Sequence, residues 1–308
     1  MSLYPHRPAL LPRALCGTLL GLACLAAAPA FADARAPLPV TALSWQAQVE
    51  RISAGADTAA RAAAITARLD ELGLPWQEHS FEIEGRSGRN VIADLGGPEG
   101  APVLLLGAHY DRVEVGHGAN DNASGVAAVL ELATMLKQQP LAGHRVQVAF
   151  WDLEERGLLG ARAWVGTEGR EQPALYVNFD VFGWGDTLWM MAPEGQEGLV
   201  EAVRAASSAQ GVGFSPGQNY PPTDHLAFLK AGWPAVSFSL VGKEEIEGIL
   251  AAYAGRKPDP TPKVMQVIHS ERDTPAELDA THMEQALRSV DASLRAWDAA
   301  ASAHAHAH

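Results

Sequence analysis

The chain has 308 residues, of which 47% are hydrophobic and 19% are charged, with 29 Gly, 20 Pro and only 2 Cys. This composition excludes a collagen-like, coiled-coil or disulfide-stapled protein, and the length allows one large domain or two modest ones. The formal net charge of −13 argues against nucleic acid or an anionic membrane as a partner.

The first 32 residues have the pattern of a secretory signal peptide. Two arginines precede an apolar run from Ala14 to Ala28, and residues 30–32 read Ala-Phe-Ala, a small-x-small cleavage pattern. The run is shorter than the roughly 18–20 residues that a bilayer span needs. We therefore expect an exported protein, periplasmic or secreted, with no membrane span. Cys24 leaves a lipoprotein signal as an alternative. Cys16, the other cysteine, also lies in the expected signal peptide, so cleavage after Ala32 would leave a mature chain without a thiol.

The rest of the chain alternates between strand and helix patterns. Two helices are expected first, over residues 42–53 and 58–72. Short segments rich in branched residues then predict strands at 90–95, 103–108, 145–151, 174–179 and 235–240. Helical patterns lie between and after them, at 124–138, 158–165, 198–209, 224–231 and 275–299. The alternation predicts a single α/β domain over residues 33–300, with a mostly parallel central sheet flanked by helices on both faces. Residues 301–308 alternate Ala with His and are expected to form a disordered tail.

Polar side chains follow several of these segments, at the sheet edge where open α/β folds bind ligands. His109 and Asp111 come directly after the strand at 103–108. Asp121 lies between glycines ahead of the next helix, where capping of that helix is the simpler interpretation. A carboxylate that bridges two cations would account for the glycines and for the nearness of His109 as well.

Three more acidic residues and a second histidine continue the pattern. Glu154 and Glu155 follow the strand at 145–151, and of two adjacent carboxylates one can bind a cation while the other accepts a proton from metal-bound water. Asp180 follows the strand at 174–179 and would be costly to bury unpaired. Residues 264–268 lead into His269, whereas Asp273 is explained by an ordinary helix start. Nitrogen and oxygen donors without thiolate suit a hydrolytic pair of Zn²⁺ ions, with Mn²⁺ or Co²⁺ as substitutes.

These segments resemble the secreted zinc aminopeptidases with two co-catalytic metals. That family includes bacterial leucyl aminopeptidases, and its relatives include glutamate carboxypeptidase and glutaminyl cyclase. The resemblance rests on GAHYDRV, GANDNASGVA, FWDLEERGLLGARAW, NFDVFG, TDHLAFLKAGWPAVSFS and IHSERDT, which span residues 107–274. It implies that residues 33–300 form a zinc-peptidase catalytic domain.

The resemblance also implies a role for each site residue. His109 and Asp180 would bind one zinc, Glu155 and His269 the other, and Asp121 would bridge the two ions. Glu154 would be the general base, Asp111 would orient His109, and the peptide bond after Asp121 would often be cis in this family. Asp224 and His225 would be structural rather than metal ligands.

Together these roles imply an aminopeptidase that hydrolyses peptides with a free N-terminus. The alternatives are a glutaminyl-peptide cyclotransferase with a single zinc, a carboxypeptidase of the same fold, and a binding module that has lost its metals. Four aromatic residues are candidates for an apolar wall of the substrate pocket: Phe182, Trp184, Phe214 and Tyr220. The sequence leaves the preferred N-terminal residue and the oligomeric state open.

Overall fold

The computed structural model describes residues 45–305. Within this range eight strands form one sheet, in the order β1-β2-β4-β3-β5-β8-β6-β7. The four central strands β4, β3, β5 and β8 run parallel, whereas antiparallel pairs join β1 to β2, β2 to β4 and β6 to β8. The strands are β1 (Trp76–Ile83), β2 (Arg86–Gly96), β3 (Val103–His109), β4 (Arg145–Trp151), β5 (Leu175–Phe179), β6 (Thr187–Met191), β7 (Gly213–Gly217) and β8 (Ala235–Val241).

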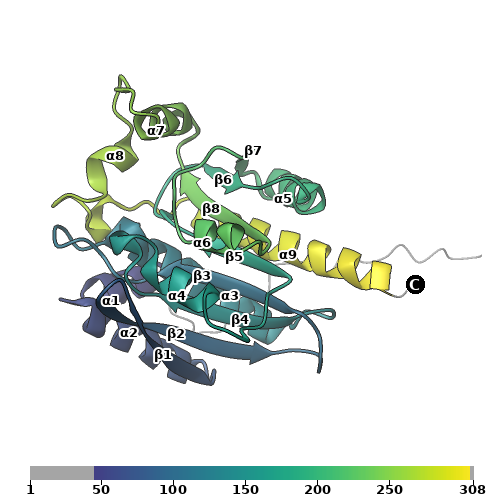
Figure 1. Ribbon diagram of the computed structural model, residues 1–308. Helices are drawn as coiled ribbons and strands as arrows, with labels where there is room; N and C mark the ends of the chain where they lie inside the picture. Colours follow the sequence, from purple (N-terminus) through teal and green to yellow (C-terminus); the bar gives the residue numbers. More distant parts are fainter. Residues whose placement is uncertain (1–44, 306–308) are drawn as a thin grey trace, which may run out of the picture. The chain divides into compact units, whose positions relative to one another are not determined.

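Helices cover both faces of this sheet. The core on one face contains side chains of α1, α2, α3, α5 and α9, and the core on the other contains those of α4 and α6, which Figure 1 shows in front of the strands. A third apolar cluster joins α7 and α8 to residues near β6 and β8. The helices are α1 (Trp45–Ser53), α2 (Thr58–Glu71), α3 (Ser124–Gln138), α4 (Leu159–Val165), α5 (Glu197–Gln210), α6 (His225–Lys230), α7 (Ile246–Tyr253), α8 (Lys263–Val267) and α9 (Met283–Ala305).

The central strands are apolar on both sides because both sides are buried. In β3, Leu104 and Leu106 point into the first core, whereas Val103 and Leu105 point into the second. This is the side-chain alternation of a strand, with apolar residues at every position rather than at every other one. The predicted fold class, an α/β domain with a mostly parallel sheet between two helical layers, is confirmed.

Several elements differ from the sequence prediction. Strands β1, β6 and β7 were not predicted; β7 contains both Gly and Pro, which are uncommon inside strands. Helix α7 was also missed. Residues 264–268, which lead into His269, lie mostly in the short helix α8; five residues, four of them apolar, do not distinguish a strand from a helix in the sequence.

The last helix also has different limits. Residues 275–277 form only a 3₁₀ turn, and α9 begins at Met283. It continues to Ala305, so it includes the first five residues of the expected tail, where Ala favours helix. The expected signal peptide, both cysteines and residues 306–308 lie outside the described residues.

Candidate metal centre

The carboxyl ends of the central parallel strands meet at one edge of the sheet, and the predicted site residues lie there. His109 is the last residue of β3 and pairs in register with Trp151, the last residue of β4. Glu154 therefore follows the neighbouring strand at the same edge. Asp180 directly follows β5, whose last residue is Phe179. The parallel register of three strands thus brings residues from distant parts of the sequence to one place.

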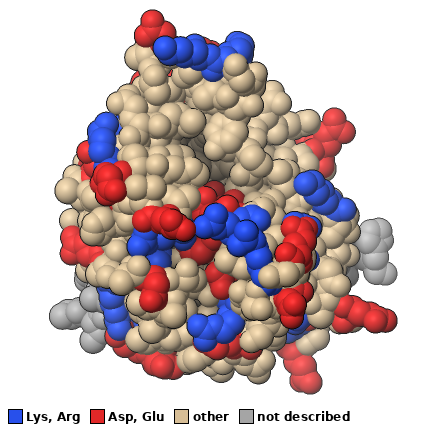
Figure 2. Space-filling view, turned by 60° about the vertical axis from the view of Figure 1, so that its left-hand side comes forward, with Lys and Arg blue, Asp and Glu red and all other residues tan. Residues whose placement is uncertain are grey.

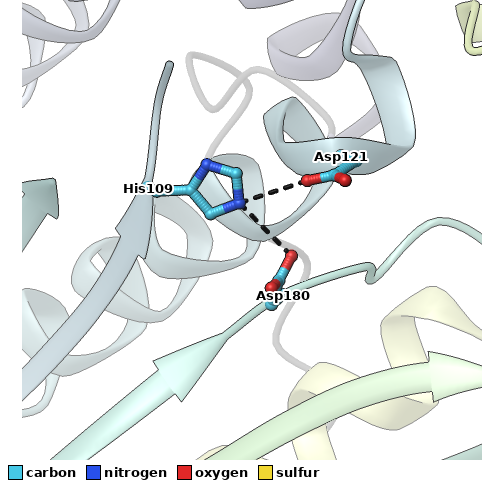
Figure 3. Close-up of side chains that lie close together, drawn as sticks. All are labelled: His109, Asp121 and Asp180. Carbon is cyan, nitrogen blue, oxygen red and sulfur yellow. Dashed lines mark ion pairs between the residues drawn. The ribbon is translucent and has the colours of Figure 1, made fainter. Parts of the chain in front are cut away.

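The first ligand group consists of His109, Asp121 and Asp180. Figure 3 shows the imidazole of His109 directed at both carboxylates. Its Nε2 lies 3.1 Å from Oδ1 of Asp121 and 3.5 Å from Oδ1 of Asp180. Burial of the ring would lower the pKa of His109, but the charge of Glu154 and the surrounding carboxylates raise that pKa well above its usual value.

The second group shares Asp121 with the first. Nε2 of His269 lies 3.1 Å from Oδ2 of Asp121 and 3.2 Å from Oε2 of Glu155. Hydrogen bonds to these two carboxylates raise the pKa of His269 to about 11. Burial would raise the pKa of Asp121, but the imidazoles on its two sides lower it below its usual value. One carboxylate therefore faces a histidine with each of its oxygens, as a bridge between two cations requires.

Several buried atoms of this site have no hydrogen-bond partner among the described residues. They include both ring nitrogens of His109, Oε1 of Glu155 and Oδ1 of Asp180. Buried polar atoms in proteins are almost always paired, and metal coordination is one way to satisfy them. Within each group the candidate donor atoms all lie within 4.8 Å of one another. A set of imidazole and carboxylate donors without thiolate fits Zn²⁺, and Mn²⁺ or Co²⁺ also bind such donors.

Glu154 lies in the same pocket but belongs to neither ligand group. Burial raises the pKa of its carboxyl well above the usual value, and the negative charges of Asp224 and Asp180 add to the shift. A carboxylate that is held away from the ligand positions and has a raised pKa is suited to accept and return a proton.

The backbone near the site has unusual conformations. The peptide bond between Asp121 and Asn122 is cis, as the family resemblance implies. Three residues have positive φ angles: Leu153, which precedes Glu154, at 57°, Val181, which follows Asp180, at 54°, and His269 itself at 56°. This region is unfavourable for β-branched residues such as Val, so the surrounding structure must hold Val181 in place.

A pocket of about 100 Å³ opens beside the carboxylates. Figure 2 shows a hollow in this face of the molecule, with Asp and Glu atoms below it and uncharged residues around it. Of the four aromatic residues expected in the wall, Tyr220 lines the pocket and the other three do not. Phe182 is buried in the main core, Phe214 packs against that core, and Trp184 is buried in the cluster with α7 and α8. The other lining residues are largely apolar: Val181, Trp189, Pro221, Pro222, Val241, Ile249, Tyr253, Val264, Met265 and Ile268. Trp189 and Tyr253 were not foreseen, because they belong to β6 and α7, two elements that the sequence analysis missed.

Asp224 and His225 do not join either ligand group. Both are buried, and burial lowers the pKa of His225 to about 4, which keeps its ring neutral. Both carboxylate oxygens of Asp224 lack a hydrogen-bond partner among the described residues.

Arg61 is a residue near the site that the sequence analysis did not single out. It is fully buried in α2, where it donates hydrogen bonds to the carbonyls of Tyr110, His117 and Gly118. These carbonyls belong to the loop between His109 and Asp121. The sequence holds one indication that Arg61 is buried: it lies four residues before Ile65 and eight before Leu69, on the apolar face of the predicted helix.

Several known proteins are similar to this chain in sequence. The model of peptidase family M28 matches residues 90–293. The probable lipoprotein aminopeptidase LpqL of Mycobacterium tuberculosis is 41% identical over 119 residues, which are 33% of this chain and 24% of that protein. The chain spans between about a quarter and a third of the length of the curated relatives it matches.

Solved structures also share this fold. BSAP, a zinc aminopeptidase from Bacillus subtilis, superimposes with a TM-score of 0.56 at 26% identity, over 69% of this chain and 50% of that one. Glutaminyl cyclase from Porphyromonas gingivalis superimposes with a TM-score of 0.63 at 24% identity, over 83% of this chain and 96% of that one.

Proposed function

The chain belongs to peptidase family M28, and on that premise we propose that it is a zinc-dependent aminopeptidase, which uses two metal ions to remove N-terminal residues from peptides. The observation that carries this proposal is the position of Asp121, whose two oxygens face His109 and His269 at 3.1 Å each. A shared carboxylate between two ligand groups is the arrangement expected for a pair of ions. Similarity to aminopeptidases in sequence and structure supports the same activity.

In this proposal His109 and Asp180 hold one zinc, Glu155 and His269 hold the other, and Asp121 bridges them. When bound, such a metal pair lowers the pKa of a water molecule and polarises a carbonyl group. Glu154 takes a proton from the attacking water and returns it to the departing amine. Its raised pKa supports this role, because a base that must also act as an acid works best with a pKa nearer to neutrality.

Preference for a chain end is part of this proposal. The lone pair of a free α-amino nitrogen could bind one of the two zinc ions, whereas the nitrogen of an internal peptide bond is a poor metal ligand. The small apolar pocket beside the carboxylates accommodates the side chain of the first residue.

We also propose that the protein is exported, because the pattern over residues 1–32 is that of a signal peptide. None of the helices in residues 45–305 is long and apolar enough to cross a membrane. Cell fractionation followed by N-terminal sequencing tests the proposal. A mature N-terminus at Asp33 in the periplasm or medium is expected, whereas an uncleaved chain in the cytoplasm would contradict it.

The activity itself is tested with a panel of aminoacyl p-nitroanilides, before and after chelation and after restoration of Zn²⁺. Glutaminyl-peptide cyclisation and release of C-terminal residues are assayed alongside. We expect chelator-sensitive release of p-nitroaniline that zinc restores. Cyclisation without peptidase activity would support a cyclase, and release of C-terminal residues alone would support a carboxypeptidase.

A further inference from the structure

We propose that Asp273 is a positioning residue that sets the distance between Asp121 and His269, and thereby builds the second metal group. The inference rests on the proposed function, since it concerns the same ligands. It starts from two loops: the one before α3, which carries Asp121, and the one after α8, which carries His269. Asp273 lies in the second loop, and its side chain contacts the first.

The carboxylate of Asp273 is buried and binds backbone N–H groups rather than another side chain. Oδ1 accepts the N–H of Asn120 at 2.6 Å, and Oδ2 accepts the N–H of Asp121 at 3.2 Å. The exposed fraction of Asp273 is 2%. Hydrogen bonds from N–H groups to an ionised carboxylate are among the stronger ones, and two of them from adjacent residues fix an orientation. Asp273 therefore holds the backbone of the proposed bridging residue directly.

Main-chain contacts hold the same two loops together. The N–H of His117 donates to the carbonyl of Asp273 at 2.8 Å. Gly116 packs so closely that a Cβ at this position would lie 2.3 Å from the carbonyl oxygen of Ser270. Only glycine allows that approach, so the loops meet at one defined register.

The turn between His269 and Asp273 transmits this register to the histidine. The N–H of Asp273 donates to the carbonyl of Ser270 at 3.1 Å, and the hydroxyl of Ser270 donates to the carbonyl of Val267 at 2.7 Å. A short, internally bonded turn thus separates Asp273 from His269. Both histidine and bridging aspartate take their positions from one residue.

Helix capping does not explain Asp273, contrary to the interpretation from the sequence. The turn at residues 275–277 has Thr274 at its N-cap position, without a side-chain capping bond. The Asp273 carboxylate faces the loop before α3 instead. The helix-start pattern in the sequence suggested a local role for Asp273, whereas its carboxylate binds residues more than 150 positions earlier in the chain.

The two metal groups should depend on Asp273 unequally. The second group takes both Asp121 and His269 from the loops that Asp273 joins, and only Glu155 from elsewhere. The first group takes only Asp121 from these loops. Loss of the Asp273 carboxylate should therefore weaken binding of the second ion more than binding of the first.

Zinc binding by the full chain, measured by competition with a chromophoric chelator, tests this inference. The variants are Asp273→Asn, which keeps one acceptor oxygen, and Asp273→Ala, which keeps none. Asp279→Asn is the matched control, because Asp279 accepts the N–H of Thr281 at an exposed turn of the same segment. Thermal unfolding of each metal-free protein is recorded, and binding is measured well below the lowest midpoint. If Asp273→Ala does not fold, Asp273→Asn carries the test.

We expect the Asp279→Asn variant to bind two zinc ions, as wild type does, and the affinity for each ion to be similar in the two proteins. In the Asp273 variants the dissociation constant of one ion should rise about 10–100-fold, which is the usual effect of losing a partner that orients a ligand. The fold increase for the other ion should be at least ten times smaller. Unchanged affinities, or equal losses for both ions, would overturn the inference and leave the proposed function intact. A wild-type protein that binds fewer than two zinc ions would contradict both.

Discussion

The backbone N–H of Glu154 donates a 3.0 Å hydrogen bond to Oδ1 of Asp111. The other oxygen of that carboxylate accepts the N–H of Glu155 at 3.2 Å, and Oδ1 also lies 3.4 Å from Nδ1 of His109. One buried side chain therefore contacts the histidine at the end of β3 and the two glutamates after β4. These contacts place Asp111 where it could orient residues of both proposed metal groups and the proposed base.

Replacing Asp111 by Asn should reduce zinc affinity about 10–100-fold. The amide keeps one acceptor oxygen. Its NH₂ group would face a backbone N–H that in wild type donates to the carboxylate, and two donors cannot form a hydrogen bond with each other. Competition with a chelator measures the affinity. Asp57→Asn is the control, since Asp57 caps the exposed start of α2 through the N–H of Ala60. Equal zinc affinity in both variants would show that Asp111 does not orient the ligands.

Replacing Glu154 by Gln should lower kcat by about 10²–10⁴, the usual contribution of a general base, and leave two zinc ions bound. The amide has nearly the same shape but cannot accept the proton. Steady-state hydrolysis of an aminoacyl p-nitroanilide, together with metal analysis, separates the two effects. Glu114→Gln serves as the control because Glu114 is an exposed residue that pairs with Arg156. Normal turnover by the Glu154 variant would remove this residue from the reaction.

The order of elements explains why most of this centre could be predicted. His109, Glu154, Glu155 and Asp180 follow strands whose apolar runs are visible in the sequence, and parallel strands place their carboxyl ends together. The structure brings these residues close to Asp121 and His269, and their catalytic roles stay predictions.

What the sequence could not reveal depends on contacts between distant backbone groups. Arg61 and Asp273 bind carbonyl and N–H groups of the loop between β3 and α3, and backbone groups leave no mark on composition or periodicity. The pocket wall was predicted poorly for a related reason. Trp189 and Tyr253 come from elements with weak local signals, and packing against the rest of the protein decides their structure.

Replacing Arg61 by Lys should destabilise the protein by about 2–4 kcal/mol. The guanidinium binds three carbonyls, whereas an ammonium on a shorter stem cannot reach all of them, and an unsatisfied buried carbonyl costs about 1–3 kcal/mol. Urea unfolding of the metal-free proteins measures the difference. Arg51→Lys, at a solvent-accessible ion pair with Glu71, should change stability by less than about 0.5 kcal/mol. Equal effects of the two substitutions would show that the three carbonyl contacts contribute little.

Glu131 should make stability depend on pH. It is buried in α3, where Nε2 of Gln48 donates a hydrogen bond to its carboxyl group. Burial raises the pKa of Glu131 from 4.5 to about 7, with the charge of Arg68 opposing the shift. Since the folded state holds this proton more tightly than the unfolded state, the proton stabilises the fold below pH 4.5. That stabilisation is lost as the pH rises toward 7.

A shift of this size corresponds to about 3 kcal/mol. Glu131→Gln keeps an acceptor for Gln48 but has no proton to lose. Its free energy of unfolding, relative to that of wild type, should therefore increase by about 3 kcal/mol between pH 4.5 and pH 8. Urea unfolding of the metal-free proteins across this range measures the difference, and comparison with wild type cancels the titration of the metal-site carboxylates. A difference that does not change with pH would mean that Glu131 titrates alike in the folded and unfolded chains, and that water or Arg68 compensates for its burial.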